Sequence, residues 1–302
     1  MPDRFTDEHV ETWRREGAVM LPEFFTPNEI AAVTGDFELV FPDRQGGHEA
    51  LVKKKAGEIG AFNQAQFKNF ENIPFDCSPA LNLLCVHPAL VELARSALHT
   101  REIQLYQSQA WAKFTGEADF EQLFHCDFGN HTLTVPSEDE CANSITFLIY
   151  FTDVTEDHGP THYVTKTDST RAGVPAATFS DDLDLQDQLR DYERTTAAPA
   201  GSIFAYGIDV YHRGTNLTVQ GGYRYAVTSC FKKAGNEAIG YMAWQFQHTK
   251  PWHRIFDHAT PDQLGCFGVP KPGDSFWTEQ TLIAAQLRYP NWDMSPYKDG
   301  LY

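Results

Sequence analysis

Five stretches with strand-like alternation constrain the fold of this chain more than any other feature. They lie in its middle, where aromatic and β-branched residues dominate and where glycine, proline, asparagine and aspartate separate one stretch from the next. The five stretches are residues 101–114, 144–154, 161–165, 201–207 and 223–233. Helical segments come before them, and helices followed by many short strands are typical of a β-sandwich or β-barrel with a helical cover.

The segments around the strands carry helix signals. Residues 6–35 predict two helices around an extended segment, with Thr6 and Thr26 as candidate N-caps. Residues 78–98 predict a further helix, which is broken near its internal proline. The acidic stretch 180–194 predicts either a helix or a solvated insertion.

We expect a single domain over residues 1–302. Residues 1–100 are predicted to be mostly helical, residues 101–235 to form the β core, and residues 236–302 to wrap around that core. The last segment is rich in Trp, Pro and Tyr and has little periodicity, so we expect its tryptophans to pack against the outer side of the sheet. These tryptophans are Trp244, Trp252, Trp277 and Trp292.

Charge and cysteine content exclude several classes of function. The net charge of −17 argues against nucleic acid or an anionic membrane as a partner. No apolar run approaches the roughly 20 residues that span a bilayer, and the charged N-terminal segment has no apolar signal core. We therefore expect a cytoplasmic location. The six cysteines are scattered without a CxxC pair, which favours free thiols over zinc or redox motifs.

The stretch FHCDFGN (124–130) is the first candidate for a site. His125 and Asp127 are two residues apart, so on or at the end of a strand their side chains point the same way and can reach one metal ion. Two histidines and one carboxylate hold iron in non-haem Fe(II) oxygenases, and His212, just after a predicted strand, is a candidate third ligand. Arg224, at the start of the next strand, can bind a dicarboxylate bidentately. Taken alone, the pair His125–Asp127 is better explained by a surface ion pair, and the metal interpretation depends on His212 and Arg224.

The motifs in their order resemble the phytanoyl-CoA dioxygenase family of Fe(II)/2-oxoglutarate oxygenases. The resemblance extends from about residue 5 to about residue 232. It rests on five segments of the sequence: FTDEHVETWRREGAVMLPEFFTPNEIAAV, FHCD, TDVTEDHGPTHYVTKTD, GSIFAYGIDVYHRGTN and YRYAVTSCF. It implies a double-stranded β-helix (jelly-roll, cupin-like) core with surrounding α-helices, and it implies Fe(II), 2-oxoglutarate and O2 as cofactor and co-substrates.

The resemblance also implies roles for individual residues. His125, Asp127 and His212 would bind iron, and Arg224 would pair with the distal carboxylate of 2-oxoglutarate. Thr161 would place a hydroxyl near that carboxylate. Polar side chains on the strands before HxD would also contact the co-substrate; they are Gln109, Lys113 and Gln122.

The chain departs from the family pattern at one place. Thr165-Lys166-Thr167-Asp168 replaces the usual Pro-Gly-Ser-His, which puts the local turn in doubt. The carboxylate ligand Asp127 is present, and this disfavours a halogenase.

The expected function is a dioxygenase that hydroxylates an unactivated C–H bond of a small metabolite or natural-product intermediate. One alternative is a cupin-like metal-dependent hydrolase or isomerase that does not use 2-oxoglutarate, for which Arg224 would serve no purpose. Another is a catalytically silent member that binds a metabolite, for which an intact ligand set is not required.

Other polar and aromatic residues near these motifs have simpler interpretations. His131, His158 and His162 are expected to be loop residues or outer hydrogen-bond partners rather than ligands. Cys126 is expected to point away from the metal. Four aromatic residues are interpreted first as core: Trp111, Tyr150, Phe204 and Tyr206.

Overall fold

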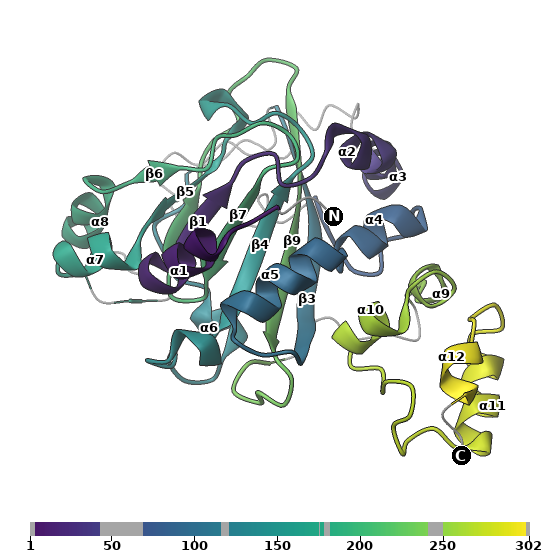
Figure 1. Ribbon diagram of the computed structural model, residues 1–302. Coiled ribbons are helices and arrows are strands. Elements are labelled where there is room, and N and C mark those ends of the chain that lie inside the picture. Colours follow the sequence, from purple (N-terminus) through teal and green to yellow (C-terminus); the bar gives the residue numbers. More distant parts are fainter. Residues whose placement is uncertain are drawn as a thin grey trace.

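Two antiparallel sheets facing each other form the centre of the protein (Figure 1). The computed structural model describes residues 4–42, 69–115, 121–174, 176–177, 182–240 and 250–299. The larger sheet has the strand order β1-β7-β4-β9-β3-β2, and the smaller sheet has the order β6-β5-β8. The strands are β1 (Ala18–Leu21), β2 (Phe70–Asn72), β3 (Ile103–Phe114), β4 (Ser144–Tyr150), β5 (Thr161–Val164), β6 (Arg194–Thr195), β7 (Ile203–Gly207), β8 (Tyr211–Gly214) and β9 (Tyr223–Lys233). This is the jelly-roll arrangement that the sequence analysis predicted.

All five predicted strands are present, with small differences at their ends. The predicted strand 144–154 ends at Tyr150. His212, which was predicted to come just after the strand at 201–207, follows β7 and itself lies on β8, a strand that pairs with β5 in the smaller sheet.

Helices cover the outer face of the larger sheet (Figure 1). Those of the N-terminal part are α1 (Asp7–Glu16), α2 (Pro27–Thr34), α3 (Asp36–Val40), α4 (Pro79–Leu84) and α5 (Pro88–Ala97). The expected caps are present: the Thr26 hydroxyl accepts a hydrogen bond from the Glu29 N–H at 3.3 Å, and Thr6 precedes α1. Short helices flank the smaller sheet and the strand connections: α6 (Phe128–His131), α7 (Lys166–Arg171) and α8 (Leu183–Arg190), the last within the acidic stretch.

Strand alternation separates an apolar outer face of the larger sheet from a polar inner face. On β9, Tyr225, Val227 and Phe231 point outward into the main core beneath the helices. Arg224 and Thr228, which alternate with them, point into the space between the sheets. The inner face therefore carries the side chains that are available for binding.

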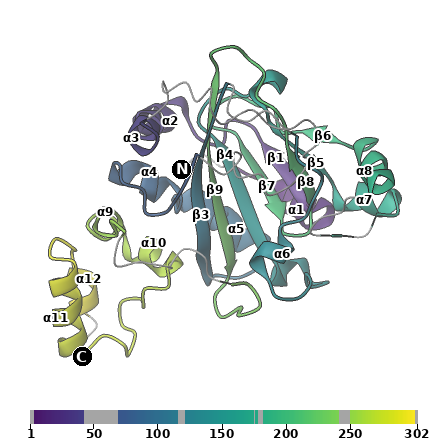
Figure 2. The ribbon, with the colours of Figure 1, turned by 180° about the vertical axis from the view of Figure 1, so that it is seen from behind.

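The C-terminal helices lie beside α4 and β3 and extend away from the sheets (Figure 1, Figure 2). They are α9 (His253–Phe256), α10 (Pro261–Cys266), α11 (Glu279–Arg288) and α12 (Ser295–Lys298). Trp252, Trp277 and Trp292 contact aromatic rings of this same segment, whereas Trp244 lies outside the described residues. Of the helices that the structure describes, none is both long enough and apolar enough for a bilayer crossing.

Candidate metal centre

His125, Asp127 and His212 converge where the chain before α6 runs beside β8. His125 and His212 exchange two backbone hydrogen bonds, each 3.0 Å long, so this short bridge fixes the two residues opposite each other. Asp127 follows two residues later, directly before α6. One nitrogen or oxygen atom from each of the three side chains lies within 4.8 Å of the others. Three side chains from two distant segments thus form one compact ligand set.

Backbone carbonyls orient both imidazole rings. The Nδ1 atom of His125 lies 2.9 Å from the Leu123 carbonyl, and that of His212 lies 3.0 Å from the Val210 carbonyl. A carbonyl only accepts, so each Nδ1 carries a proton, and in the neutral form of the ring Nε2 then keeps its lone pair. The Nε2 atoms face Asp127, at 3.9 Å from Oδ1 for His125 and 3.5 Å from Oδ2 for His212.

The charge state of the set suits a divalent cation. Burial, with a smaller effect from neighbouring His212, lowers the pKa of His125 to about 4, so its ring is neutral at pH 7. Burial opposes ionisation of Asp127, but the nearby histidines and a hydrogen bond from Tyr206 hold its pKa below the usual value. Neutral imidazoles and an ionised carboxylate are the forms that bind metal.

A cationic pair lies in the same cavity. Arg224 and Lys113 are direct partners in the pairing of β9 with β3. Arg224 is buried and donates a hydrogen bond to the Gly159 carbonyl, while its Nε has no partner. Lys113 donates to the Thr215 carbonyl at 2.8 Å. Within the described ranges no carboxylate forms an ion pair with either side chain.

This pair of cations is poorly solvated. Burial lowers the pKa of Arg224, and burial together with Arg224 holds the pKa of Lys113 well below its usual value. Two buried cations without a counterion are costly, and a bound dianion removes that cost. The arrangement therefore fits 2-oxoglutarate, just as the ligand set of two histidines and one carboxylate fits Fe(II).

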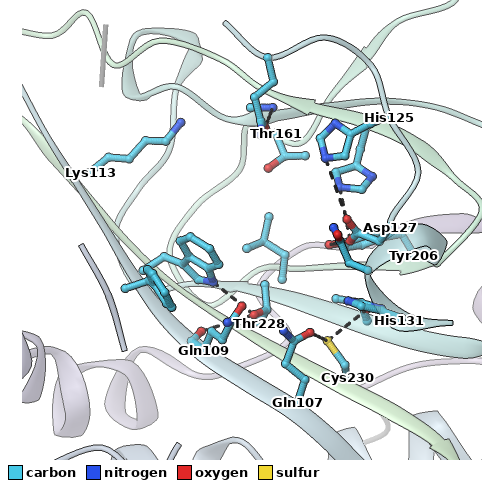
Figure 3. A pocket seen from close by; sticks show the side chains of 18 of the residues that line it. Gln107, Gln109, Lys113, His125, Asp127, His131, Thr161, Tyr206, Thr228 and Cys230 are labelled. Atoms are coloured by element: carbon cyan, nitrogen blue, oxygen red, sulfur yellow. Dashed lines mark hydrogen bonds and ion pairs between the residues drawn. The ribbon is translucent and has the colours of Figure 1, made fainter. Parts of the chain in front are cut away.

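All the predicted site residues line one cavity of about 400 Å³ between the sheets (Figure 3). Its lining includes the three candidate ligands and the candidate co-substrate residues, which are Arg224, Thr161, Gln122, Gln109 and Lys113. Two of these side chains already form hydrogen bonds within the protein, which limits the atoms that they can offer to a ligand. The Gln122 Oε1 accepts from the Gly214 N–H at 2.7 Å, and the Gln109 Nε2 donates to Asn72 at 3.0 Å. Which atoms of iron or co-substrate each residue contacts stays a prediction.

The cavity also contains residues that sequence reasoning missed or assigned to the core. Trp111 and Tyr206 were interpreted as core residues, but both line the cavity, and Tyr206 donates to Asp127 Oδ2 at 3.4 Å. His131 and Gln107 line it as well. Residues 107, 109, 111 and 113 are two apart along β3 and therefore share one face of the strand. This spacing was the sequence signal that could have identified them as cavity residues.

The segment that departs from the family pattern forms a helix start. Thr165 caps α7 by accepting a hydrogen bond from the Asp168 N–H at 3.2 Å, and Asp168 pairs with Arg171 and Arg194. None of the residues of this segment lines the cavity. The replacement therefore alters the start of α7, outside the cavity, and leaves the ligand set intact.

The comparisons with known proteins agree with this geometry. A family model described as Phytanoyl-CoA dioxygenase (PhyH) matches residues 13–224, more than two thirds of the chain. A search of curated protein sequences finds no significant match.

Several solved structures have the same fold. EctD from S. alaskensis, solved with 2-oxoglutarate and 5-hydroxyectoine, is 14% identical with a TM-score of 0.59 and 83% of each chain covered. The carbocyclase SnoK from nogalamycin biosynthesis is 20% identical with a TM-score of 0.57, covering 77% of this chain and 86% of SnoK. The epimerase SnoN, solved with Fe3+, alpha ketoglutarate and nogalamycin RO, is 16% identical with a TM-score of 0.54, covering 76% of this chain and 83% of SnoN. At these identities the likeness shows the fold alone.

Proposed function

The chain belongs to the phytanoyl-CoA dioxygenase family, and from this premise we propose that it is an Fe(II)/2-oxoglutarate-dependent oxygenase that hydroxylates a small metabolite. Fe(II), 2-oxoglutarate and O2 are the cofactor and co-substrates of this family. Together they supply the oxidant that replaces a C–H bond by C–OH, while 2-oxoglutarate is converted to succinate and CO2.

The chain's own residues would position these groups. His125, Asp127 and His212 would hold the iron through two nitrogens and one oxygen on one side, which leaves the other side for co-substrate and O2. Arg224 would bind the distal carboxylate of 2-oxoglutarate, and the nearby Thr161 hydroxyl would add a donor. The side chains that line the cavity between the two sheets would keep bulk water from the reacting atoms.

One observation carries the proposal: the ligand set and a buried, partly unpartnered guanidinium line the same cavity. The Arg224 Nε has no hydrogen-bond partner although it is buried, and such groups are rare unless a ligand satisfies them. A hydrolase or isomerase that used only the metal would gain nothing from Arg224 and Lys113 at this place. The cationic pair therefore supports the use of a dicarboxylate co-substrate.

Hydroxylation is the outcome we propose among those that this fold supports. The EctD structure contains a hydroxylated compound, whereas SnoK is titled a carbocyclase and SnoN an epimerase. Mass spectrometry of the product separates the three outcomes. Hydroxylation adds the mass of one oxygen atom, ring closure removes two hydrogens, and epimerisation leaves the mass unchanged.

Anaerobic titration with Fe(II) and then 2-oxoglutarate tests the proposal directly. We expect the weak visible charge-transfer band of the iron chelate to appear in the wild type. Arg224→Ala should need about 30-fold more 2-oxoglutarate for the same band, because hydrogen bonds to a charged group contribute about 2 kcal/mol. Arg101→Ala, which changes an exposed arginine far from the cavity, is the matched control and should titrate like the wild type.

Two results would contradict the proposal. Iron binding without the band would favour a metal enzyme that does not use 2-oxoglutarate. An unchanged 2-oxoglutarate requirement in Arg224→Ala would show that another group anchors the co-substrate.

A further inference from the structure

The cavity has two chemically different ends. The register of β3, β9 and β4 arranges their inward side chains in rows across the larger sheet. Lys113 and Arg224 form the row at one end. The row formed by Gln107, Cys230 and Thr146 lies six residues further along β3, roughly 20 Å away at the rise of an extended strand. We call this second region the neutral end.

Asp127 is the member of the ligand set that borders the neutral end. Tyr206 pairs with Thr146 in the register of β7 and β4, and its hydroxyl donates to Asp127 at 3.4 Å. Figure 3 shows Lys113, Thr161 and His125 in the upper part of the cavity and Gln107 and Cys230 at the bottom, with Asp127 at an intermediate height on the side of His125. A co-substrate anchored at Arg224 would therefore leave the neutral end for the substrate.

Two buried polar side chains at the neutral end have atoms without partners. Gln107 is 7% exposed; its Oε1 is 3.6 Å from the Cys230 thiol, and its amide nitrogen has no hydrogen-bond partner among the described residues. His131 is 6% exposed, and its Nδ1 is 2.9 Å from the Tyr106 hydroxyl, which is itself held by Ser144. The remaining ring nitrogen of His131 has no partner in the described part of the chain. Both groups line the cavity, so a ligand is the available partner.

Among the described residues, no charged side chain at this end is available to pair with a charged ligand. Asp127 belongs to the ligand set, and the cations Lys113 and Arg224 lie at the other end of the cavity. The rest of the lining is hydroxyl, amide, thiol and imidazole groups together with the apolar surfaces of Leu148 and Trp111. A charged group buried here without a counterion would lose its hydration without compensation.

We propose that the part of the substrate that enters the neutral end is an uncharged ring bearing hydroxyl groups. Its hydroxyls would bond to the Gln107 amide and the His131 ring, and its apolar face would lie on Leu148, which is in the next row of the sheet. A hydroxyl both donates and accepts, which matches an amide beside an imidazole whose tautomer adapts. The proposal rests on the proposed function, because the location of the co-substrate decides which end remains for the substrate.

Three probes that differ only in charge test this inference. They are methyl β-D-glucopyranoside, which is neutral, the corresponding methyl glucuronide, which is anionic, and the corresponding 2-amino glucoside, which is cationic. Binding is measured by saturation-transfer NMR titration on the full chain with 2-oxoglutarate and Zn(II), a diamagnetic replacement for Fe(II), and again on the metal-free chain. We expect the neutral probe to bind at least tenfold more tightly than either charged probe.

Substitutions at Gln107 make the test specific to this end. Gln107→Leu should weaken the neutral probe at least fivefold, and Gln107→Glu should shift the preference toward the cationic probe. Gln263→Leu removes a glutamine on α10, away from the cavity, and should leave all three affinities unchanged.

Several results would overturn the inference. They are a charged probe that binds as well as the neutral one, a neutral probe that does not bind, or a neutral affinity that is unchanged in Gln107→Leu. The visible band of the Fe(II) sample reports on the proposed function independently. If that band is absent, the effect of Gln107→Leu on the neutral probe still decides what the neutral end binds, because Asp127 and the cationic pair are the same in the two chains that are compared.

Discussion

At the scale of single residues, the metal centre depends on one carboxylate and two rings that the backbone holds in place. The carbonyls of Leu123 and Val210 fix the tautomer of the two histidines, so both Nε2 atoms face Asp127 before any metal arrives. Such outer hydrogen bonds orient ligands and raise their basicity. The candidate centre is therefore preorganised, and His125, Asp127 and His212 would each supply one of the three donor atoms for the iron.

Replacing His212 by alanine removes one ligand and leaves the other two without a third donor. We expect Fe(II) affinity to fall by more than about 100-fold, since loss of an outer partner alone costs 10–100-fold. Anaerobic equilibrium dialysis followed by metal analysis measures this change. His253→Ala, at an exposed histidine on α9, is the control and should bind iron normally. Undiminished iron binding in His212→Ala would move the metal site elsewhere.

The order and spacing of several motifs predicted which residues meet in the cavity, but not the whole lining of the cavity. The pair His125–Asp127 is weak evidence by itself, and it is the later His212 and Arg224 that make the set recognisable. Trp111 and Tyr206 were assigned to the core because alternation shows which side chains share a face of a strand, not what that face meets. The smaller sheet turns the inner face into a cavity wall, and its strands alternate along the chain with those of the larger sheet, so local pattern could not show which strands face each other.

At the scale of elements, a chain of charged groups ties β8 to its neighbours. Arg213 on β8 donates to Glu193 at 2.6 Å and to Glu121 at 2.8 Å, and Glu193 also lies 2.7 Å from the Nδ1 of His162 on β5. Arg213 directly follows the candidate ligand His212. These contacts, on the side of the smaller sheet away from the cavity, therefore support the strand that carries the ligand.

This network makes stability depend on pH through Glu193. Burial alone would raise the pKa of this carboxyl, but hydrogen bonds from His162 and Arg213 lower it to about 2. Because the folded pKa is below the unfolded value of about 4.3, the stabilisation is fully present above about pH 4.3 and is lost as the pH falls toward 2. Glu193→Gln should lower the free energy of unfolding by about 2 kcal/mol at pH 7. Urea denaturation at pH 7 and at pH 3.5 should show this difference shrinking at the lower pH. A difference that is independent of pH would mean that the carboxylate charge contributes nothing.

The sequence predicted long elements better than short ones. Caps such as Thr6 and Thr26 mark the start of α1 and α2, because a side chain must satisfy the first N–H groups of a helix. β2, β6 and β8 were not predicted. Strands of two or three residues, such as β6 and β2, carry too little alternation to be recognised, and they exist because longer neighbours offer them backbone partners.

At the scale of the whole molecule, one apolar core connects the sheet to the C-terminal helices. Phe37 of α3 stacks on Tyr225 of β9 with ring centroids 4.7 Å apart, and the same buried cluster continues to Trp292 and Tyr297. Within the C-terminal part, Trp292 meets Phe256 at 4.8 Å and Tyr297 at 5.0 Å. Because the cluster is continuous, we predict that residues 236–302 unfold together with the jelly roll, as one domain.

Replacing Trp292 by alanine tests that prediction. Trp292 is 4% exposed, so its removal should cost about 3–5 kcal/mol. If the chain is one cooperative unit, near-ultraviolet circular dichroism and the visible band of the iron chelate should lose their signals in one transition, at a lower temperature than in the wild type. Leu287→Ala, at an exposed leucine on α11, should leave that temperature nearly unchanged.

If instead the dichroism changed first while the iron band was lost only at the wild-type temperature, the C-terminal helices would be an independent unit. The metal centre would then not depend on the C-terminal helices. The jelly roll would keep the candidate ligands and Arg224 in place without those helices, and these are the residues that the proposed reaction uses.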